Sequence, residues 1–419
     1  MSDAAEGMLV SKTSRWKARH TVLSILFMTW IVSTMDRMAM SVAIPYIAAD
    51  YHLGALASGV VMSAFYAGYA ISQVPGGLLA DRFGVRRVAT IAMLWWSAFT
   101  AITGAAANLI QMLGVRFVFG LGEGMFPACA FKTIAVWFPT KERATANAFM
   151  LASNPLGVAL SPLAVVGIMS LGGWRTVFYS LFVPGVLISL CFWMFVPDRP
   201  ADSPRVSPEE LVEIEDGSVV AVQGSQTATL LIVLKEPGVL KYFLVLLTFD
   251  IAFWGFTAWL PTYLVKARGF SMVQMGVAAS LPYFAGTVGS VLGGWISDKY
   301  FNDRRRIPIV ICQLLSALFL YLTFVASTAT QLVLCQTLAG LFFSSFFSTF
   351  WALPMNTVPR NLMGVAGGFI NMAGQAAAFI SPMFVGYLVG AAGGSFDHTF
   401  VFLIVSLLVS SALVFTLPT

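Results

Sequence analysis

The sequence predicts an all-α, polytopic membrane protein with twelve transmembrane helices in two parallel six-helix repeats. Three observations predict this fold class: composition, long apolar runs, and motifs that recur in the second half. Of the 419 residues, 58% are hydrophobic and only 10% are charged, whereas a soluble domain has roughly a quarter charged residues. Apolar runs recur along the whole chain, each near the ~20 residues that cross ~30 Å of hydrocarbon. They lack the alternating pattern of barrel strands, which excludes an outer-membrane barrel.

The apolar runs between turn and charge clusters give the expected helices in order. They are 21–49, 54–80, 85–107, 108–138, 142–170, 174–196, 237–266, 272–297, 306–326, 330–356, 361–390 and 396–417. The only long connection divides the chain into an N-terminal bundle (1–196), a cytoplasmic linker (197–236) and a C-terminal bundle (237–419). Within the linker, Ser207 and Pro208 are typical of a helix start, and Glu210 has the spacing of a capping box. The linker is therefore expected to contain a short surface helix.

The distribution of Lys and Arg indicates the orientation in the membrane. Of the 24 Lys and Arg residues, 18 lie on the side of the N-terminus, 3 on the opposite side and 3 within spans. This bias places both termini in the cytoplasm and explains the net charge of +5 without a nucleic-acid partner. No N-x-S/T acceptor occurs, which favours a bacterial inner membrane. The four cysteines are scattered singly, and the three histidines lie outside the spans or, for His398, at the very start of the last one, so neither a metal site nor a cofactor is expected.

The two halves repeat each other. "GGLLADRFGVRR" after the second span is echoed by "GGWISDKYFNDRRR" after the eighth, which places Asp81 and Asp298 217 residues apart. "AFMLASNPLGVALSPLAVVG" aligns with "GFINMAGQAAAFISPMFVGY" at an offset of 220 residues. Parallel repeats of this kind place a binding site between the halves near mid-membrane, with alternating access by rocking.

These motifs carry a resemblance to a known family. The loop formed by Gly77, Asp81, Arg82, Gly84, Arg86 and Arg87 resembles the signature loop of the major facilitator superfamily, and Arg116-x-x-x-Gly120 resembles its fourth-helix motif. Within the superfamily, "MDR", "WFPTKERATA" and "WLPTYLVKARGFS" resemble the anion:cation symporter family, which includes galactonate, glucarate, hexuronate and phthalate permeases. The resemblance implies two six-helix bundles around a central cavity and proton-coupled uptake of an organic anion. For the loop, including Asp298 in its second copy, it implies a gate and not a ligand site.

Six charged residues lie well inside the spans, where charge is costly and functional use is the default hypothesis. They are Asp36, Arg37, Arg116, Glu123, Lys132 and Asp250. Arg116 and Glu123 are seven residues apart, two turns along one helix face. The spacing permits two crossed ion pairs, Asp36 with Arg116 and Arg37 with Glu123, and these pairs could also serve packing alone.

The resemblance assigns roles to this group, because the matching family positions hold the substrate-binding arginine and the proton-carrying acids. Arg37 is the expected carboxylate ligand, since its planar fork meets a carboxylate with two hydrogen bonds. Protonation of Glu123 would release Arg37 to bind the substrate. Asp36 is the second candidate proton carrier, with pairing to Arg116 as its alternative role.

Asp250 lies outside the family pattern, and Lys132 is the remaining charge within the spans. Asp250, roughly 13 Å along the seventh helix at 1.5 Å per residue, is either a further titrating group or a residue facing a water-filled crevice. Lys132 is expected to reach towards the cytoplasmic end of its helix and not the substrate.

Polar side chains form stripes that are candidates for the cavity lining. By the resemblance, Tyr69 and Gln73 line the cavity, and Ser348, Trp351 and Asn371 fall where sugar-acid permeases contact substrate hydroxyls. Gln375 extends the stripe of Asn371, and interhelical hydrogen bonding is the alternative role for these residues. Asn154 stands where a glutamine is expected in galactonate-like members, and "LFFSSFFSTFW" is heavily aromatic. Both departures leave room for an aromatic or less hydroxylated acid.

The sequence therefore predicts a monomeric transporter that imports a small carboxylate, such as a sugar acid, by proton symport, with the lipid bilayer as its surroundings and the proton as coupling ion. The alternatives are symport of an aromatic or other small carboxylate and proton-independent anion exchange. No Walker loop or H-E-x-x-H motif occurs, so an enzyme is not expected.

Overall fold

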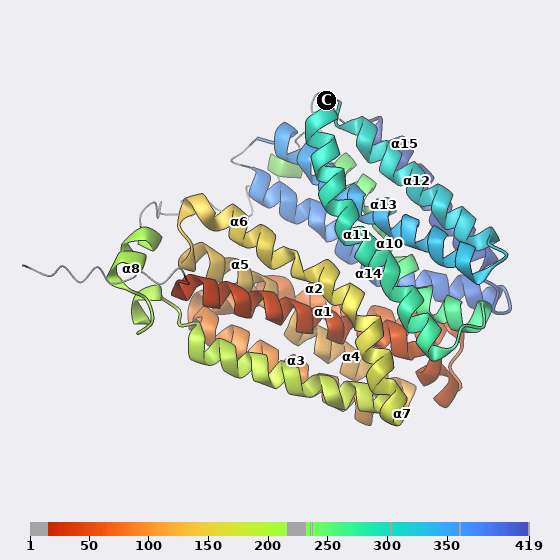
Figure 1. Cartoon of the computed structure of the whole chain (residues 1–419), viewed down its shortest axis with the longest axis horizontal. Coiled ribbons are helices and arrows are strands. Elements are labelled where there is room, and N and C mark those ends of the chain that lie inside the picture. The colour runs from red at the N-terminus through yellow and green to blue at the C-terminus, as the bar shows by residue number, and fades with distance from the viewer. Residues whose placement is uncertain are drawn as a thin grey trace, which may run out of the picture.

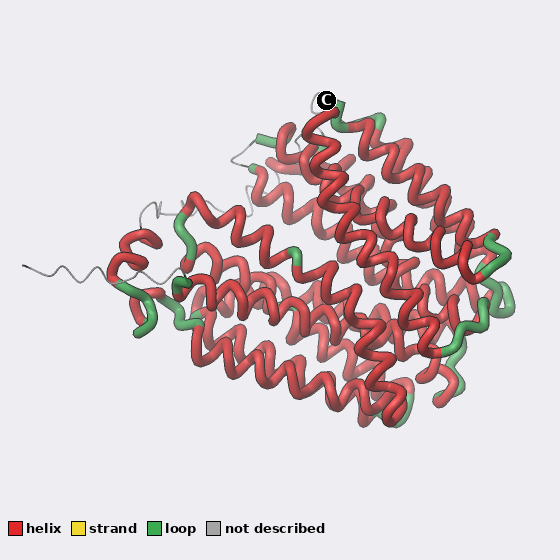
Figure 2. The backbone as a smooth tube through the Cα atoms, viewed as in Figure 1, coloured by secondary structure: helices red, strands yellow, loops and turns green. Residues whose placement is uncertain are grey.

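In the computed structural model of the chain, residues 16–215, 232–234, 236, 238–301, 304–359 and 362–417 are described. These residues contain helices, turns and loops but no strand (Figure 2). The predicted all-α fold class is therefore confirmed. Arg360 and residues 216–231 and 235 of the predicted linker lie outside the described residues.

The membrane helices follow the predicted order, with ends that differ by a few residues. They are α1 (Ala18–Asp50), α2 (Ala55–Phe83), α3 (Val85–Ala105), α4 (Leu109–Glu123), α5 (Phe126–Trp137), α6 (Thr140–Leu151), α7 (Ser153–Phe195), α10 (Val239–Thr262), α11 (Met272–Tyr300), α12 (Arg306–Val325), α13 (Ala329–Thr357), α14 (Met363–Ala391) and α15 (Asp397–Val414). Between the sixth and seventh spans lie the short helices η1 (Pro200–Asp202) and α8 (Pro208–Glu215), and α10 continues into a π-helix, η2 (Tyr263–Ala267).

Eleven helical stretches of the described chain are long and apolar enough to cross a membrane. One of them, Thr140–Phe195, has 56 residues, which corresponds to about 84 Å of helix and cannot fit once across ~30 Å of hydrocarbon. It is interrupted by non-helical backbone at Gly172 and Gly173, and Gly173 has φ of 78°, a conformation that favours glycine. This stretch therefore contains the predicted fifth and sixth spans, and twelve crossings result.

Two predicted spans are broken in the middle. The predicted helix 108–138 divides into α4 and α5 at Gly124 and Met125, and the predicted helix 142–170 is interrupted at Ala152. Pro127 and Pro155 follow these breaks, and each proline lacks the N–H that would continue the preceding helix. Interrupted helices are tolerated at membrane depth where they are buried in protein or line a cavity.

The helices form two groups, α1–α7 and α10–α15, whose ribbons diverge towards the end that carries α8 (Figure 1). At the other end the groups touch through glycines. A Cβ added to Gly59 of α2 would stand 3.0 Å from the Cα of Met383 in α14, and one added to Gly276 of α11 would stand 2.8 Å from Val166 of α7. The halves are therefore held backbone to backbone at the end opposite the termini.

The motif that was expected to form a loop after the second span lies mostly in the last turns of α2 and the first turn of α3, with only Gly84 between these helices. It is fixed by contacts within its own half. Asp81 pairs with Lys132 of α5 at 2.7 Å, so the Lys132 side chain reaches the last turns of α2. Gly84 has φ of 88°, and the next turn is held by Arg86, whose backbone N–H donates to Asp198 at 2.9 Å. In the second copy, Asp298 pairs with Arg305 at 2.9 Å. The two acids are each 70% exposed, so in this conformation neither is buried between the halves.

Helix α8 binds the start of α1 through hydrogen bonds. Ser207 accepts from the N–H of Glu210 at 3.2 Å, which confirms the predicted cap. The Glu210 carboxylate does not close a capping box; it accepts from the backbone N–H groups of Ala18 and Arg19 at 3.1 and 3.0 Å. These N–H groups have no partner inside α1, so a carboxylate satisfies them and opposes the helix dipole.

A second acid of α8 contributes to the same contact. Glu213 pairs with Lys17 at 2.5 Å, and Arg19 lies 3.1 Å from Glu213. The hydrogen bond from Lys17 lowers the pKa of Glu213. The stabilisation from this ion pair is therefore present at neutral pH and is lost as the pH falls through the lowered pKa of Glu213.

We expect Glu210→Ala to lower the free energy of unfolding by about 1–2 kcal/mol, because two N–H groups at a buried helix start lose their acceptor. The measurement is thermal or denaturant unfolding in detergent. Glu209→Ala is the matched control, since Glu209 is an exposed acid on the same helix. An equal loss of unfolding free energy in both variants would contradict a stabilising role for the hydrogen bonds that Glu210 accepts from the start of α1.

Candidate functional site

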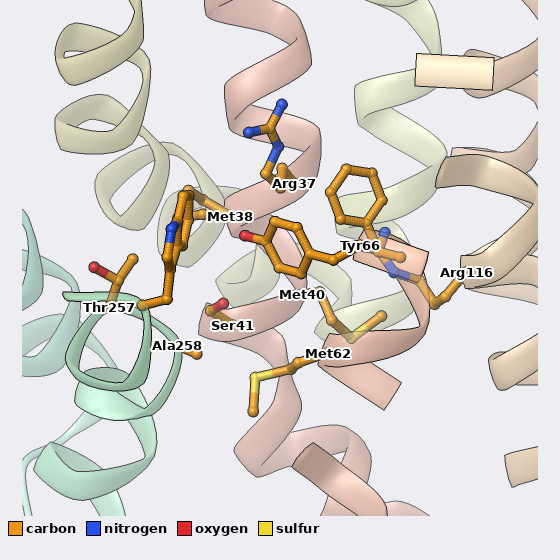
Figure 3. Close-up of a pocket in the computed structure, with 11 residues that line it drawn as sticks. Arg37, Met38, Met40, Ser41, Met62, Tyr66, Arg116, Thr257 and Ala258 are labelled. Atoms are coloured by element: carbon orange, nitrogen blue, oxygen red, sulfur yellow. The ribbon is translucent and has the colours of Figure 1, made fainter. Parts of the chain in front are cut away.

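A small buried pocket lies between the two halves (Figure 3). Its lining comes from α1, α2 and α4 of the first half and from α10 of the second: Arg37, Met38, Met40, Ser41, Met62, Phe65, Tyr66, Arg116, Trp254, Thr257 and Ala258. The free space is enough for about one water molecule. In this conformation the pocket is therefore nearly closed, and a larger solute requires the halves to separate.

Arg37 and Glu123 form an ion pair beside this pocket. Arg37 Nη2 lies 2.5 Å from Glu123 Oε1, with the side chains 12% and 1% exposed. The hydroxyl of Ser33, one turn before Arg37, donates to the same oxygen at 2.6 Å. The Arg37 guanidinium also lies over the rings of Phe65 and Tyr69, at 5.3 and 5.1 Å from their centroids. One of the two crossed pairs that the spacing permits is thus formed.

The other crossed pair, Asp36 with Arg116, is not formed. Asp36 is fully buried, and neither of its carboxylate oxygens has a hydrogen-bond partner among the described residues. Arg116 is directed instead at aromatic faces, with its Cζ 4.6 Å from the centroid of Phe119 and 5.3 Å from that of Phe65. Cation–π contact replaces the expected ion pair because the two aromatic rings flank the guanidinium.

Tyr66 and Trp254 close the pocket from opposite halves. Their ring centroids are 5.3 Å apart, in an edge-to-face arrangement, and the two residues belong to α2 and α10. Tyr66 projects into the pocket from the side opposite Thr257 and Ala258 (Figure 3). This contact joins the halves at the level of Arg37, so it must break when the pocket opens.

The remaining predicted lining residues lie outside this pocket. The Asn154 side-chain oxygen is 3.1 Å from the Thr34 hydroxyl, a contact between the fifth span and α1. Ser348 donates to the carbonyl of Ser345, within its own helix, at 3.0 Å. The other residues are Gln73, Trp351 and Gln375, which are half-buried, and Asn371, which is exposed. With the halves in contact, none of these side chains reaches the closed space.

Sequence reasoning missed the contribution of α10 to the pocket. Trp254, Thr257 and Ala258 line it, and they continue a helical spacing that begins at Asp250. That spacing was visible in the sequence, but a tryptophan in an apolar run reads equally well as packing. Asp250 itself is 3% exposed and lies one turn from the pocket. No group of three metal-ligating side chains occurs among the described residues.

The site thus has a guanidinium at a pocket between the halves, neutralised by one buried carboxylate. Such a pair can take an anion in place of the carboxylate when a proton neutralises the latter. An unpaired buried charge is strongly unfavourable, so the two events are energetically linked. The geometry therefore fits binding of an anion together with a proton.

Comparisons with known proteins identify the family. The family model described as Major Facilitator Superfamily matches residues 26–382 and 303–419. The chain is 34% identical over 398 residues to the probable galactarate/D-glucarate transporter GarP of Escherichia coli, with 88% of each chain covered. It is 32% identical over 393 residues to the probable sulfoacetate transporter SauU of Cupriavidus necator, covering 92% of this chain and 90% of the relative.

A solved structure shares the fold. The chain superposes with a TM-score of 0.80 on a bacterial homologue of the human lysosomal transporter Spinster, described as inward-facing and occupied. The match covers 96% of this chain and 97% of the other, at 17% sequence identity. At this identity the likeness concerns the fold alone.

We expect Trp254→Ala to open the pocket to water, because it removes the ring that meets Tyr66. Ser41, on the pocket wall, provides the probe position: Ser41→Cys should react slowly with a membrane-impermeant thiol reagent in the parent protein and at least about tenfold faster in Trp254→Ala. The parent protein with Ser41 intact is the control for the four native cysteines. Equal rates in both backgrounds would mean that Trp254 does not close the pocket.

Proposed function

The chain belongs to the Major Facilitator Superfamily and is a multi-pass membrane transporter, not an enzyme, and from this premise we propose that it imports an organic carboxylate by proton symport. The coupling ion is the proton and the working unit is a monomer. The protein lies in a bacterial inner membrane with both termini in the cytoplasm. The Lys and Arg bias of the sequence supports this orientation.

The observation that carries the proposal is the buried Arg37–Glu123 pair. With Glu123 ionised, Arg37 is already neutralised and has little attraction left for an anion. When Glu123 takes up a proton, Arg37 is left without a counter-charge, and a substrate carboxylate restores neutrality with a two-pronged hydrogen bond. Loss of either the proton or the substrate leaves one buried charge uncompensated. The change between outward-open and inward-open states is therefore favourable only when both the proton and the substrate are bound, or neither.

The substrate class is proposed to be a small acid of the sugar-acid type. The names of the relatives support an organic acid: one refers to a hydroxylated acid, galactarate or glucarate, and another to sulfoacetate, which carries no hydroxyl groups. The closed pocket offers few polar groups besides the two arginines, namely the hydroxyls of Ser41, Tyr66 and Thr257 and the indole N–H of Trp254. Its aromatic and methionine lining keeps an aromatic or sparsely hydroxylated carboxylate as the alternative substrate.

Alternating access follows from the arrangement of the halves. With the termini in the cytoplasm, the glycine contacts of α2 with α14 and of α7 with α11 lie on the outer side, and the ribbons diverge towards the inner side (Figure 1). Rocking about the pocket would separate these outer contacts and the Tyr66–Trp254 contact, and would bring the inner ends together. The loop of Asp81 and its copy at Asp298 then lie where the inner ends meet.

We expect Glu123→Gln to lower the uphill accumulation driven by a pH gradient, while exchange of labelled for unlabelled substrate continues. The amide mimics the protonated acid, so Arg37 binds substrate but no proton is carried at position 123. The measurement is uptake and counterflow in proteoliposomes. Accumulation that persists in Glu123→Gln and depends on a counter-substrate would instead indicate proton-independent anion exchange.

Arg37→Lys should raise the substrate KM by about tenfold or more, because an ammonium group cannot make the paired hydrogen bonds of a guanidinium.

The substrate itself is identified by an uptake screen of D-glucarate, D-galactonate, a hexuronate, sulfoacetate and benzoate under an imposed pH gradient. Accumulation of a neutral sugar and of no acid would contradict the role of Arg37.

A further inference from the structure

Asp250 is a buried acid for which the mechanism above has no use. It is the twelfth residue of α10, which runs Val239–Thr262. Among the described residues of α10–α15 it is the only charged residue away from the ends of the helices. The first half holds a group of four charges at this depth, whereas the second half holds this single carboxyl group.

The Asp250 carboxyl group has no counter-charge. The side chain is 3% exposed, Oδ1 has no hydrogen-bond partner, and Asp250 takes part in no ion pair among the described residues. It packs against Gly374 of α14, where an added Cβ would lie 2.7 Å from Asp250 Oδ2. The glycine therefore leaves room for the carboxyl group but supplies no charge to balance it.

The helices around α10 offer no nearby cation. Helices α13 and α14 contain no charged residue and no histidine. The charged or histidine residues of α11 and α15 lie in terminal turns, namely Asp298, Lys299, Asp397 and His398. The charges of α1 at this depth are Asp36, which is an acid, and Arg37, which is paired with Glu123. An ionised carboxylate in these surroundings is costly, so burial favours the protonated form.

Asp250 is also placed where the rocking of the halves would reach it. Asp250, Trp254 and Thr257 share one face of α10, and Trp254 touches Tyr66 of the other half. On the other side, Gly374 lies next to the half-buried Gln375. Separation of Tyr66 from Trp254 would thus uncover the face on which Asp250 lies.

We propose that Asp250 is a second proton-binding site, in the C-terminal half, and that its access to water is controlled by the contact between Tyr66 and Trp254. This rests on the proposed proton symport. The carboxylate takes up one proton from the outer solution when the halves open outward, is enclosed as a neutral group when Tyr66 and Trp254 meet again, and releases that proton inward on the side of Gly374 and Gln375. Among the described residues, Asp250 belongs to no group of three or more His, Cys, Asp or Glu side chains that could hold a metal ion.

A second proton changes what the carrier can accumulate. Each additional proton per cycle multiplies the attainable substrate ratio by about fifty for every 100 mV of driving force. It also adds one positive charge to the transported set, which balances a second negative charge on the substrate. The proposal therefore fits an acid with two anionic groups.

The test is the proton-to-substrate ratio. Proteoliposomes with the membrane potential clamped at zero are brought to equilibrium with labelled D-glucarate at several imposed pH differences. The logarithm of the accumulation ratio against the pH difference has a slope equal to the number of protons per substrate. We expect a slope of about two for the parent protein and about one for Asp250→Asn. Asp397→Asn, which alters an exposed acid of the same half, should keep the parent slope.

The outcomes separate the two proposals. A parent slope of zero overturns proton symport itself, and the inference with it. A non-zero parent slope that is unchanged in Asp250→Asn overturns only the inference. Asn resembles the protonated carboxyl group, so this variant should fold. Should it not, Asp250→Ser removes the acid without crowding Gly374, and the same change in slope decides the question.

Discussion

The ion pair between Arg37 and Glu123 is the constraint on which the rest of the site depends. Two charges are held 2.5 Å apart with the side chains almost fully buried, in a protein whose surroundings cannot hydrate them. Replacing such a pair by packed apolar residues often costs nothing, whereas removing one partner is strongly unfavourable. The pair is therefore poor support for stability alone. It is well suited to a site where the partner of the arginine must change without leaving either charge exposed to lipid.

The local structure around this pair follows from the same requirement. The helix that carries Glu123 ends at that residue and resumes at Phe126, so the acid lies beside an interruption of the backbone. Ser33, one turn before Arg37 on α1, donates to the acid, and the rings of Phe65 and Tyr69 lie against the guanidinium. A hydroxyl and two aromatic faces hold the pair in place but do not neutralise it. The charges remain available to a proton and an anion.

Much of this was predictable from sequence, because charge within an apolar run is a strong signal. The seven-residue spacing of Arg116 and Glu123 placed both near Arg37, and the course of Lys132 followed from the reach of its side chain. The failure at Asp36 and Arg116 has a different cause. Spacing predicts the contact of Arg116 with Phe119, three residues further along the same helix. Phe65, however, belongs to α2, and no helical period encodes that contact.

Contacts between distant segments account for the other differences. Glu210 has the spacing to cap its own helix, yet its carboxylate binds the start of α1, 191 residues away in sequence. A tryptophan in an apolar run is typical of a packing residue, yet Trp254 closes the pocket because α10 lies across from α2. Gln73 and Asn371, which were predicted to line the cavity, do not line the closed pocket in this conformation. The residues that line a transport cavity change as the halves rock, so one conformation does not show all of them.

The distribution of charge between the halves links these observations to transport. In the first half, Arg37 and Arg116 are matched in number by Asp36 and Glu123. Without substrate, this half therefore carries no net charge in its membrane interior when the halves rock. Binding one carboxylate adds one negative charge, and only a proton on one of the acids restores the balance. Neutralising a second anionic group in the same way requires a second proton, on the other acid of this half or on an acid elsewhere. Among the described residues, the C-terminal half offers such an acid in its membrane interior at Asp250. The number of buried acids thus limits how many negative charges the carrier can move without carrying net charge through the bilayer.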